Sequence, residues 1–373
     1  MKRPAFGRTF FCAIWLGMSV FLAVPASMAH AYQIGGRFGH SCHEEIAYDS
    51  FIDVLETFAP NVGRVELPTD RTTLRVIDGV RSNITKLGRP LSQEQAFILM
   101  SLFVGVRAPD SDGHASGNLA HTRAEHADPD DSGQYVHACR GKHDDYFEGD
   151  FKAIEGARES FMQSVRSAYK YRSATDQMLN IQMDLYLDYY GMVDLTVNAT
   201  AYYYGYAAHL VADSFSHTVR SYDDQFHKIV AVMNYVEAIY PGYKEERDGL
   251  RHSDFTDDCT EEENQPVVAA AIEASRDFAI AFAQYYETGD ETFFDGFWRD
   301  WFEIRTDCQA NFDVCGSGYW AEIAREDATR AYLECASEPR GPGASPTGWM
   351  FLVSAGGLAG MASLWRRRRR ENA

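Results

Sequence analysis

Apolar residues recur at helical spacing through most of the central part of the chain. In each such segment they lie three and four residues apart, which is the period of an amphipathic helix. The segments are 43–58, 92–106, 150–171, 176–190, 193–219, 224–239, 266–286 and 319–333. Alternating strand patterns are scarce, and we find no internal repeat. The pattern therefore predicts an all-α protein with a single multi-helix domain.

One long segment between these helices has a different composition. Residues 108–148 are rich in Asp, Gly and His, poor in apolar residues, and carry five of the chain's 12 histidines. Most connections in compact domains have only about 4–6 residues. A loop of this length is either disordered or held by a ligand, and its Asp and His content favours a metal ion.

The N-terminal segment has the pattern of a secretory signal peptide. Residues 1–31 combine three basic residues, the apolar stretch 10–24 and the small-x-small sequence Ala29-His30-Ala31. Cleavage there would start the mature domain, residues 32–340, at Tyr32. The alternative is an N-terminal anchor that is not cleaved.

The C-terminal segment also has the pattern of a targeting signal. A Gly/Pro/Ser linker at 341–348 precedes the apolar stretch 349–365 and a basic tail at 366–373. The apolar stretch is at the short limit for a membrane span, and the arginines predict a cytoplasmic C-terminus. The arrangement resembles bacterial tails recognised by sorting machinery; a plain anchor is the alternative. Either predicts an exported body, at the cell envelope, on the cell surface or secreted.

Charge narrows the choice of partner. The composition, 45% hydrophobic and 24% charged, is that of an ordinary globular protein, and the formal net charge is −19. The basic residues are concentrated at the two ends, so residues 32–340 hold 27 basic and 53 acidic residues, a net charge of −26. Such a body repels polyanions, which disfavours nucleic acid as a partner and favours cations.

Cysteine content agrees with export. Six cysteines lie beyond the leader, and an even number in an exported chain predicts disulfides. No CxxC pair is present, which argues against a thiolate zinc finger. Cys308 and Cys315 could close a small local loop, and the remaining pairing is open. The six are Cys42, Cys139, Cys259, Cys308, Cys315 and Cys335.

The most informative motif lies on the helix predicted over 193–219. His209, Asp213 and His217 are four residues apart and share one helix face. The two histidines are about 12 Å apart along the axis, too far for one ion. Asp213 could join two metal ions, or bind one ion while His217 binds another. The alternatives are a solvated polar stripe and core histidines whose hydrogen bonds are satisfied within the protein.

Two further clusters contain the same residue types. One is the loop with Asp110, Asp112 and His126, and the other is His40 with His43 at the start of the first helix. In this order the clusters resemble the zinc-dependent phospholipase C family and, more distantly, the single-strand-specific fungal nucleases. The resemblance covers about residues 32–240. It implies an all-helical fold with a long metal-binding loop and zinc ions held by His, Asp and the mature N-terminus.

The resemblance implies a role for each matching residue. Asp112 would be a metal ligand and the general base, and Asp213 would bridge two ions. The family usually begins with Trp, so Tyr32 at the mature N-terminus is a departure. The other implied ligands are His43, with His40 as its rival; His126, with His121 as its rival; and His209.

Two departures concern the third ion. His217 follows Asp213 by four residues, whereas the family spaces this histidine by six. The family also has a downstream HxxxE or HxxxD pair, and neither His227 nor His252 begins one. We keep His217 as a predicted ligand and His227 as a possible one. The sequence supports two zinc ions around Asp213 better than three.

These observations predict an exported zinc-dependent phosphodiesterase of phospholipase C type. A metal-activated hydroxide would hydrolyse a phospholipid head group at a membrane surface. Zinc is favoured over magnesium because imidazole is a major ligand. The chain lacks the GxSxG and Walker A motifs, which argues against a serine hydrolase and a P-loop NTPase. The alternatives are a nuclease of the same superfamily and a non-catalytic, metal-stabilised surface or adhesion module.

Overall fold

The computed structural model describes most of the predicted domain. The described residues are 42–52, 54–55, 65–84, 88–111, 131–141, 144, 146–173, 179–187, 191–234 and 242–326. The predicted signal peptide, the linker, the apolar segment 349–365 and the basic tail lie outside them, as do Tyr32, His40, Asp112, His121 and His126. No helix within the described ranges is long and apolar enough to cross a membrane.

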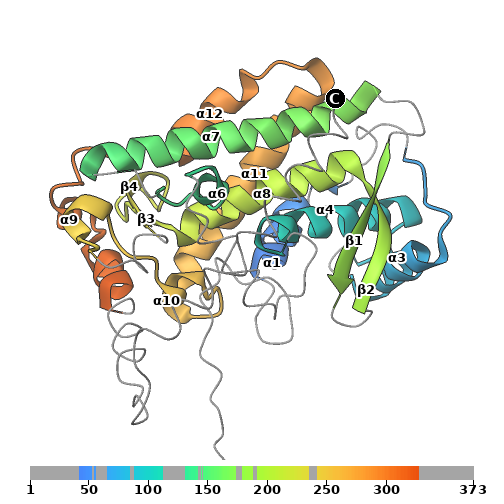
Figure 1. The fold of residues 1–373 in the computed structure, drawn as a ribbon, viewed down its shortest axis with the longest axis horizontal. Coiled ribbons are helices and arrows are strands. Elements are labelled where there is room, and N and C mark those ends of the chain that lie inside the picture. The colour runs from blue at the N-terminus through green and yellow to red at the C-terminus, as the bar shows by residue number, and fades with distance from the viewer. Residues whose placement is uncertain are drawn as a thin grey trace, which may run out of the picture.

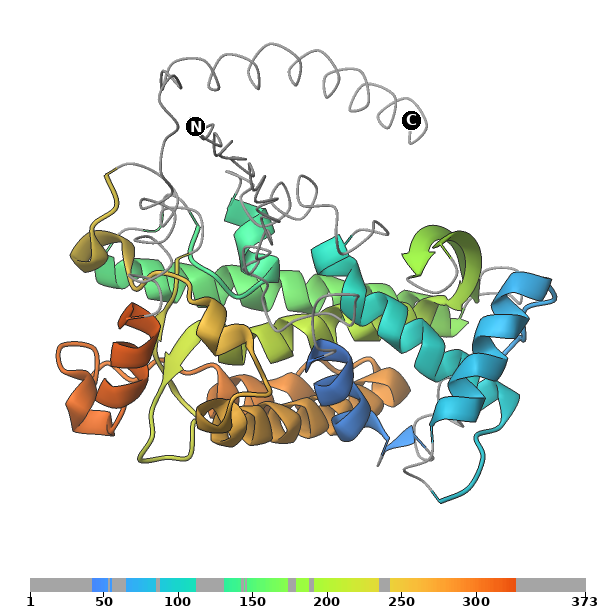
Figure 2. The ribbon, with the colours of Figure 1, turned by 90° about the horizontal axis from the view of Figure 1, so that it is seen from below.

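The fold is all-α, as predicted, and its central element is helix α8 (Ala199–Ser216). Helices α4 (Gln93–Ser111), α7 (Tyr146–Lys170) and α11 (Gln265–Thr288) pack around α8 (Figures 1 and 2). Every residue of α8 except Tyr203 and Tyr206 is buried. The polar stripe on this helix is therefore not solvated, which excludes that reading.

Shorter elements cover this core. An aromatic cluster that includes Phe161, Phe278, Phe294 and Trp298 joins α7, α11 and α12 (Phe293–Trp301). A further helix occupies 318–326, where the described chain ends. The remaining helices are α1 (Cys42–Phe51), α3 (Arg71–Asn83), α6 (Asp131–Val136), α9 (Glu245–Asp248) and α10 (Asp254–Asp257), with 3-10 turns at Tyr171–Ser173, Glu262–Asn264 and Phe312–Cys315.

Two antiparallel strand pairs replace parts of the predicted helices. Strands β1 (Asn180–Leu187) and β2 (Gly191–Asn198) form a hairpin, where we predicted helices over 176–190 and from 193. Exposed Gln182 and Asp184 alternate with inward-facing residues, which is the period of a strand. Gly191 has φ +72°, a conformation that glycine adopts readily, so the chain turns here.

The second pair corrects the helix predicted over 224–239. Strand β3 (Thr218–Arg220) pairs with β4 (Ile229–Val232), and all four residues of β4 are buried. Gln225 and Phe226 have φ values of 61° and 69°, which a right-handed helix does not allow. A continuous run of buried apolar residues satisfies both a helix and a strand pattern, and here tertiary pairing selects the strand.

Two disulfides join the described cysteines. Cys308 pairs with Cys315, which confirms the predicted local loop, and Cys42 pairs with Cys259 across 217 residues. Cys139 is a buried free thiol, and Cys335 lies outside the described residues. Burial raises the pKa of the Cys139 thiol, which keeps it protonated and unreactive.

Two glycines bring α4 and α8 unusually close together. A Cβ at Gly205 would lie 2.3 Å from the Leu102 carbonyl oxygen, and one at Gly105 would lie 2.0 Å from the Tyr202 carbonyl oxygen. Real Cβ atoms do not approach backbone atoms this closely, so only glycine fits at the crossing. The crossing sets the position of α8 relative to the C-terminal end of α4.

Replacing Gly205 with Ala is expected to destabilise the protein by about 1–3 kcal/mol, because the methyl group forces the two backbones apart. Urea unfolding of the metal-free protein measures this loss. The matched control is Gly296→Ala in α12, where a Cβ meets only the tip of Arg299 at 3.8 Å. Equal stabilities of the two variants would contradict the packing argument.

Candidate metal centre

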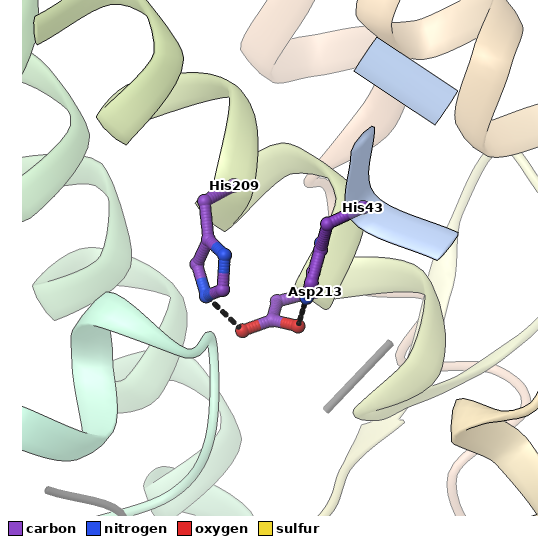
Figure 3. Close-up of side chains that lie close together, drawn as sticks. All are labelled: His43, His209 and Asp213. Carbon is purple, nitrogen blue, oxygen red and sulfur yellow. Dashed lines mark ion pairs between the residues drawn. The ribbon is translucent and has the colours of Figure 1, made fainter. Parts of the chain in front are cut away.

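Three elements that are distant in sequence direct polar side chains to one buried point. Helix α8 supplies His209 and Asp213, α1 supplies His43, and the C-terminal end of α4 supplies Asp110. His137 follows α6 and completes the group. All five side chains are almost fully buried. Figure 3 shows His43 and His209 on either side of the Asp213 carboxylate.

The Asp213 carboxylate has a different set of neighbours at each oxygen. Oδ1 lies 3.1 Å from His43 Nε2. Oδ2 lies 2.8 Å from His209 Nε2 and 2.8 Å from His137 Nδ1. A carboxylate with imidazole nitrogens at both oxygens has the geometry of a ligand that bridges two metal ions.

Asp110 completes the side of this cluster that contains His137 and His209. Its Oδ1 lies 3.7 Å from His137 Nδ1 and 3.7 Å from His209 Nε2, and its Oδ2 lies 3.8 Å from His43 Nε2. The donor atoms form two overlapping triads, His43–His209–Asp213 and Asp110–His137–His209. Within each triad the donor atoms lie within 4.8 Å of one another, so either triad can surround an ion, and the shared His209 can bind only one of the two ions.

A second cluster lies beyond the last turn of α8. His217, His252 and Asp257 place their donor atoms within 4.8 Å of one another, and all three are buried. Asp257 Oδ2 lies 2.9 Å from His252 Nε2, and its Oδ1 lies 3.6 Å from His217 Nε2. The His137 and His217 rings are 6.5 Å apart between centroids, so the two clusters are neighbours.

Backbone hydrogen bonds around β4 assemble this second cluster. Met233 N–H donates to the His217 carbonyl at 2.8 Å, and Asn234 N–H donates to the Leu250 carbonyl at 2.8 Å. His252 N–H in turn donates to the Asn234 carbonyl at 3.1 Å. The segment after β4 therefore lies between the segments that carry His217 and His252 and fixes their spacing.

Hydrogen bonds outside the clusters also fix two imidazole tautomers. His209 Nδ1 lies 2.9 Å from the Val106 carbonyl and His217 Nδ1 lies 2.5 Å from the His137 carbonyl. A carbonyl only accepts, so each Nδ1 carries the proton and donates it. Each Nε2 then faces the carboxylates with its lone pair. This orientation by outer hydrogen bonds is typical of metal-binding histidines.

The two clusters therefore contain more hydrogen-bond acceptors than hydrogen-bond donors. Asp213 Oδ1, His217 Nε2 and both Asp257 oxygens are buried and receive no hydrogen bond within the described part of the chain. A buried charged or polar atom in this state is costly unless a cation or a proton compensates. Imidazole with carboxylate is the donor set that zinc takes. The residues present therefore fit a zinc centre.

In the metal-free protein, protons on the imidazoles compensate the buried carboxylates. Burial would lower the pKa of His209, but the Asp213 and Asp110 carboxylates outweigh it and raise the pKa above its usual value. Burial likewise opposes a raised pKa at His217, and the Asp213 charge together with the Asp257 carboxylate outweighs it. Burial would raise the pKa of Asp213, yet His209, His217 and His43 hold it well below its usual value.

These directions predict how zinc and protons compete. Imidazoles with a raised pKa stabilise the metal-free protein fully below pH about 6.5, and this stabilisation is lost as the pH rises through their folded pKa. Zinc needs the same imidazoles neutral. The difference in Tm between zinc-loaded and EDTA-treated protein should therefore widen from about pH 6 to about pH 8. A difference that stays constant or narrows would contradict the ligand assignment.

The structure brings together some of the predicted ligands and separates others. His43, His209 and Asp213 converge, and His217 lies in the second cluster. His227 lies in neither cluster; its ring stacks on Trp301 with centroids 4.1 Å apart. The ligand roles of Tyr32, His40, Asp112, His121 and His126 stay predictions, because those residues lie outside the described part.

Four residues of the clusters were not predicted as ligands. Asp110 was noted in the Asp-rich motif, but Asp112 was preferred to it. His137 lies downstream of the predicted His126. His252 and Asp257 are five residues apart, so a search for an HxxxD or HxxxE pair does not find them. The sequence signal for this pair is a His and an Asp that are five residues apart instead of four.

Comparison with known proteins finds one related family over part of the chain. Residues 102–283 match the family model of zinc-dependent phospholipase C. No match was found among curated proteins or among solved structures. The matched range contains Asp110, His137, α8, His252 and Asp257, whereas His43 precedes it. Over residues 102–283 this chain is therefore similar to the zinc-dependent phospholipase C family.

Proposed function

We propose that this protein is an exported zinc-dependent phosphodiesterase that hydrolyses a phospholipid head group in the manner of a phospholipase C. The observation that carries the proposal is the Asp213 carboxylate, with His43 at one oxygen and His209 and His137 at the other. Such a carboxylate can hold two zinc ions close together in a buried site. The family match supports the phospholipase reaction class.

The clusters suggest how the ligands divide among the ions. His43 and Asp213 Oδ1 would bind one zinc, and Asp110, His137, His209 and Asp213 Oδ2 would bind a second. His217, His252 and Asp257 would bind a third. This assignment includes a third zinc site, although the sequence has no downstream HxxxD or HxxxE pair for it. Zinc, when bound, supplies positive charge that polarises a phosphoryl oxygen and lowers the pKa of water.

The protein's own residues orient this centre and handle protons. The carbonyls of Val106 and His137 hold His209 and His217 with Nε2 turned inward. Asp110 is a second described carboxylate beside Asp213 in this cluster, and its oxygens lie 3.7–3.8 Å from three histidines. The base role predicted for Asp112 stays a proposal, and Asp110 is its rival.

The remaining parts of the proposal concern the substrate and the compartment. The two disulfides favour an oxidising compartment and therefore export. The net charge of −26 over residues 32–340 disfavours nucleic acid relative to a lipid substrate. The apolar segment 349–365 would hold the domain at a membrane surface or would serve sorting machinery, as its composition suggests.

The test compares two substrates with the same zinc-loaded full chain. We expect release of phosphocholine from phosphatidylcholine vesicles and no cleavage of single-stranded DNA. Cleavage of DNA alone would favour a nuclease. Zinc-loaded protein without activity on either substrate would contradict the enzymatic proposal and favour a metal-stabilised surface module.

A further inference from the structure

The long-range disulfide joins two segments that each carry a residue of the metal centre. Cys42 immediately precedes His43, and Cys259 follows Asp257 by two residues. His43 belongs to the cluster around Asp213, and Asp257 belongs to the cluster with His217 and His252. One covalent bond therefore spans 217 residues of sequence and connects the two clusters directly.

The two joined elements are short and depend on their surroundings. Helix α1 has ten residues and is the first described element, and α10 has only four. Isolated helices of fewer than about 12 residues are marginal in water. Asn264 supports the end of α10, donating through Nδ2 to the carbonyls of Phe255 and Asp258 at 2.6 and 2.8 Å. Short elements of this kind need tertiary restraints to hold a metal ligand in place.

The disulfide is buried next to the ligands it joins. Cys42 is 0% exposed and Cys259 is 7% exposed. The Cys259 backbone N–H also donates to Cys42 Sγ at 3.3 Å. The next residue of α1, His43, is also buried, and its Nε2 lies 3.1 Å from Asp213 Oδ1. The sulfur bridge is thus part of the packing that fixes the direction of the His43 side chain.

We propose that the Cys42–Cys259 disulfide is a positioning element of the metal centre and not only a staple of the fold. It holds α1 and α10 in the arrangement that both clusters need before metal binds. The inference rests on the zinc-binding role proposed above. Without the bond, zinc binding has to order the two segments, and affinity falls by that cost. Outer contacts of zinc ligands typically change affinity by about 10–100-fold.

The chain contains its own control for this idea. The Cys308–Cys315 disulfide joins residues only seven apart and closes a loop that carries none of the cluster residues. Removing it also deletes two cysteines and one sulfur bridge. A general effect of losing a disulfide would appear in both variants, whereas an effect on positioning would appear only in Cys42→Ser/Cys259→Ser.

The experiment titrates metal-free full-length protein with zinc against a chromophoric chelator, after circular dichroism has shown that each variant is folded. We expect Cys42→Ser/Cys259→Ser to bind at least one zinc about 10–100-fold more weakly than wild type. Cys308→Ser/Cys315→Ser should bind within about threefold of wild type, since no cluster residue moves. Unchanged zinc affinity in folded Cys42→Ser/Cys259→Ser would overturn the proposal and leave the bond as a staple.

A second measurement covers the case in which Cys42→Ser/Cys259→Ser does not fold. Folded, zinc-loaded Cys308→Ser/Cys315→Ser is treated with a phosphine reductant, which then cuts only Cys42–Cys259 among the described disulfides. We expect zinc release to a chelator to accelerate at least about tenfold. Unchanged release after complete reduction would overturn the proposal. Wild type that binds no zinc would remove the proposed function as well, so the two failures are distinguishable.

Discussion

Replacing Asp213 with Asn is expected to reduce phosphodiester hydrolysis by about 10³-fold or more, because one side chain serves two ions. An amide keeps the shape of the carboxylate but supplies one oxygen and no negative charge. The oxygen facing His43 or the pair of contacts to His209 and His137 is then lost. The measurement is kcat/KM on phosphatidylcholine, together with zinc content per folded chain.

A matched control separates this effect from a general loss of negative charge. Asp184→Asn removes an exposed carboxylate from the β1–β2 hairpin, opposite Asp194 in the sheet register. This variant should keep wild-type activity and zinc content. An Asp213→Asn protein that keeps both its zinc and its activity would show that Asp213 is not the bridging ligand.

Arg220→Met is expected to cost at least about 3 kcal/mol of stability, because it leaves several buried carbonyls without a donor. Arg220 is fully buried at the end of β3. Its guanidinium donates to the carbonyls of Ser214, Phe226 and Trp301, at 2.9–3.3 Å, and lies 3.7 Å from the centre of the Phe215 ring. A cation at the C-terminal end of α8 also complements the helix dipole.

Urea unfolding of the EDTA-treated protein measures this cost without a contribution from zinc. The control is Arg299→Met, because Arg299 is exposed and pairs with its neighbour Asp300 on the surface. That change should stay within about 0.5 kcal/mol. A loss below about 1 kcal/mol in Arg220→Met would show that water or a rearranged backbone replaces the arginine's donors.

The helical framework could be predicted from the sequence because its pattern is local. The segments 92–106, 150–171 and 266–286 bury a periodic apolar face, and the structure has helices there. The segment 224–239 also looked helical, but its apolar residues are buried through pairing with β3. Strand pairing depends on a partner elsewhere in the chain, so periodicity alone does not identify it.

The metal centre likewise contains residues that could be predicted from local spacing and residues that could not. His209 and Asp213 could be found because their spacing on one helix is itself the geometry of a pair of ligands. That His217 joins the His252–Asp257 pair could not be found from spacing, because the segments of His217 and His252 are brought together by backbone hydrogen bonds of Met233 and Asn234. Asp110 lies in the last turn of α4, and helix ends are uncertain by one or two residues in sequence patterns, so the sequence does not single it out.

The most direct test of the account is anomalous diffraction at the zinc edge from crystals of the zinc-loaded protein. We expect one peak between His43 and Asp213, a second among Asp110, His137 and His209, and a third among His217, His252 and Asp257. The first two peaks should lie on opposite sides of the Asp213 carboxylate. Crystals grown with zinc that show no peak at Asp213 would contradict the central claim that this carboxylate bridges two metal ions.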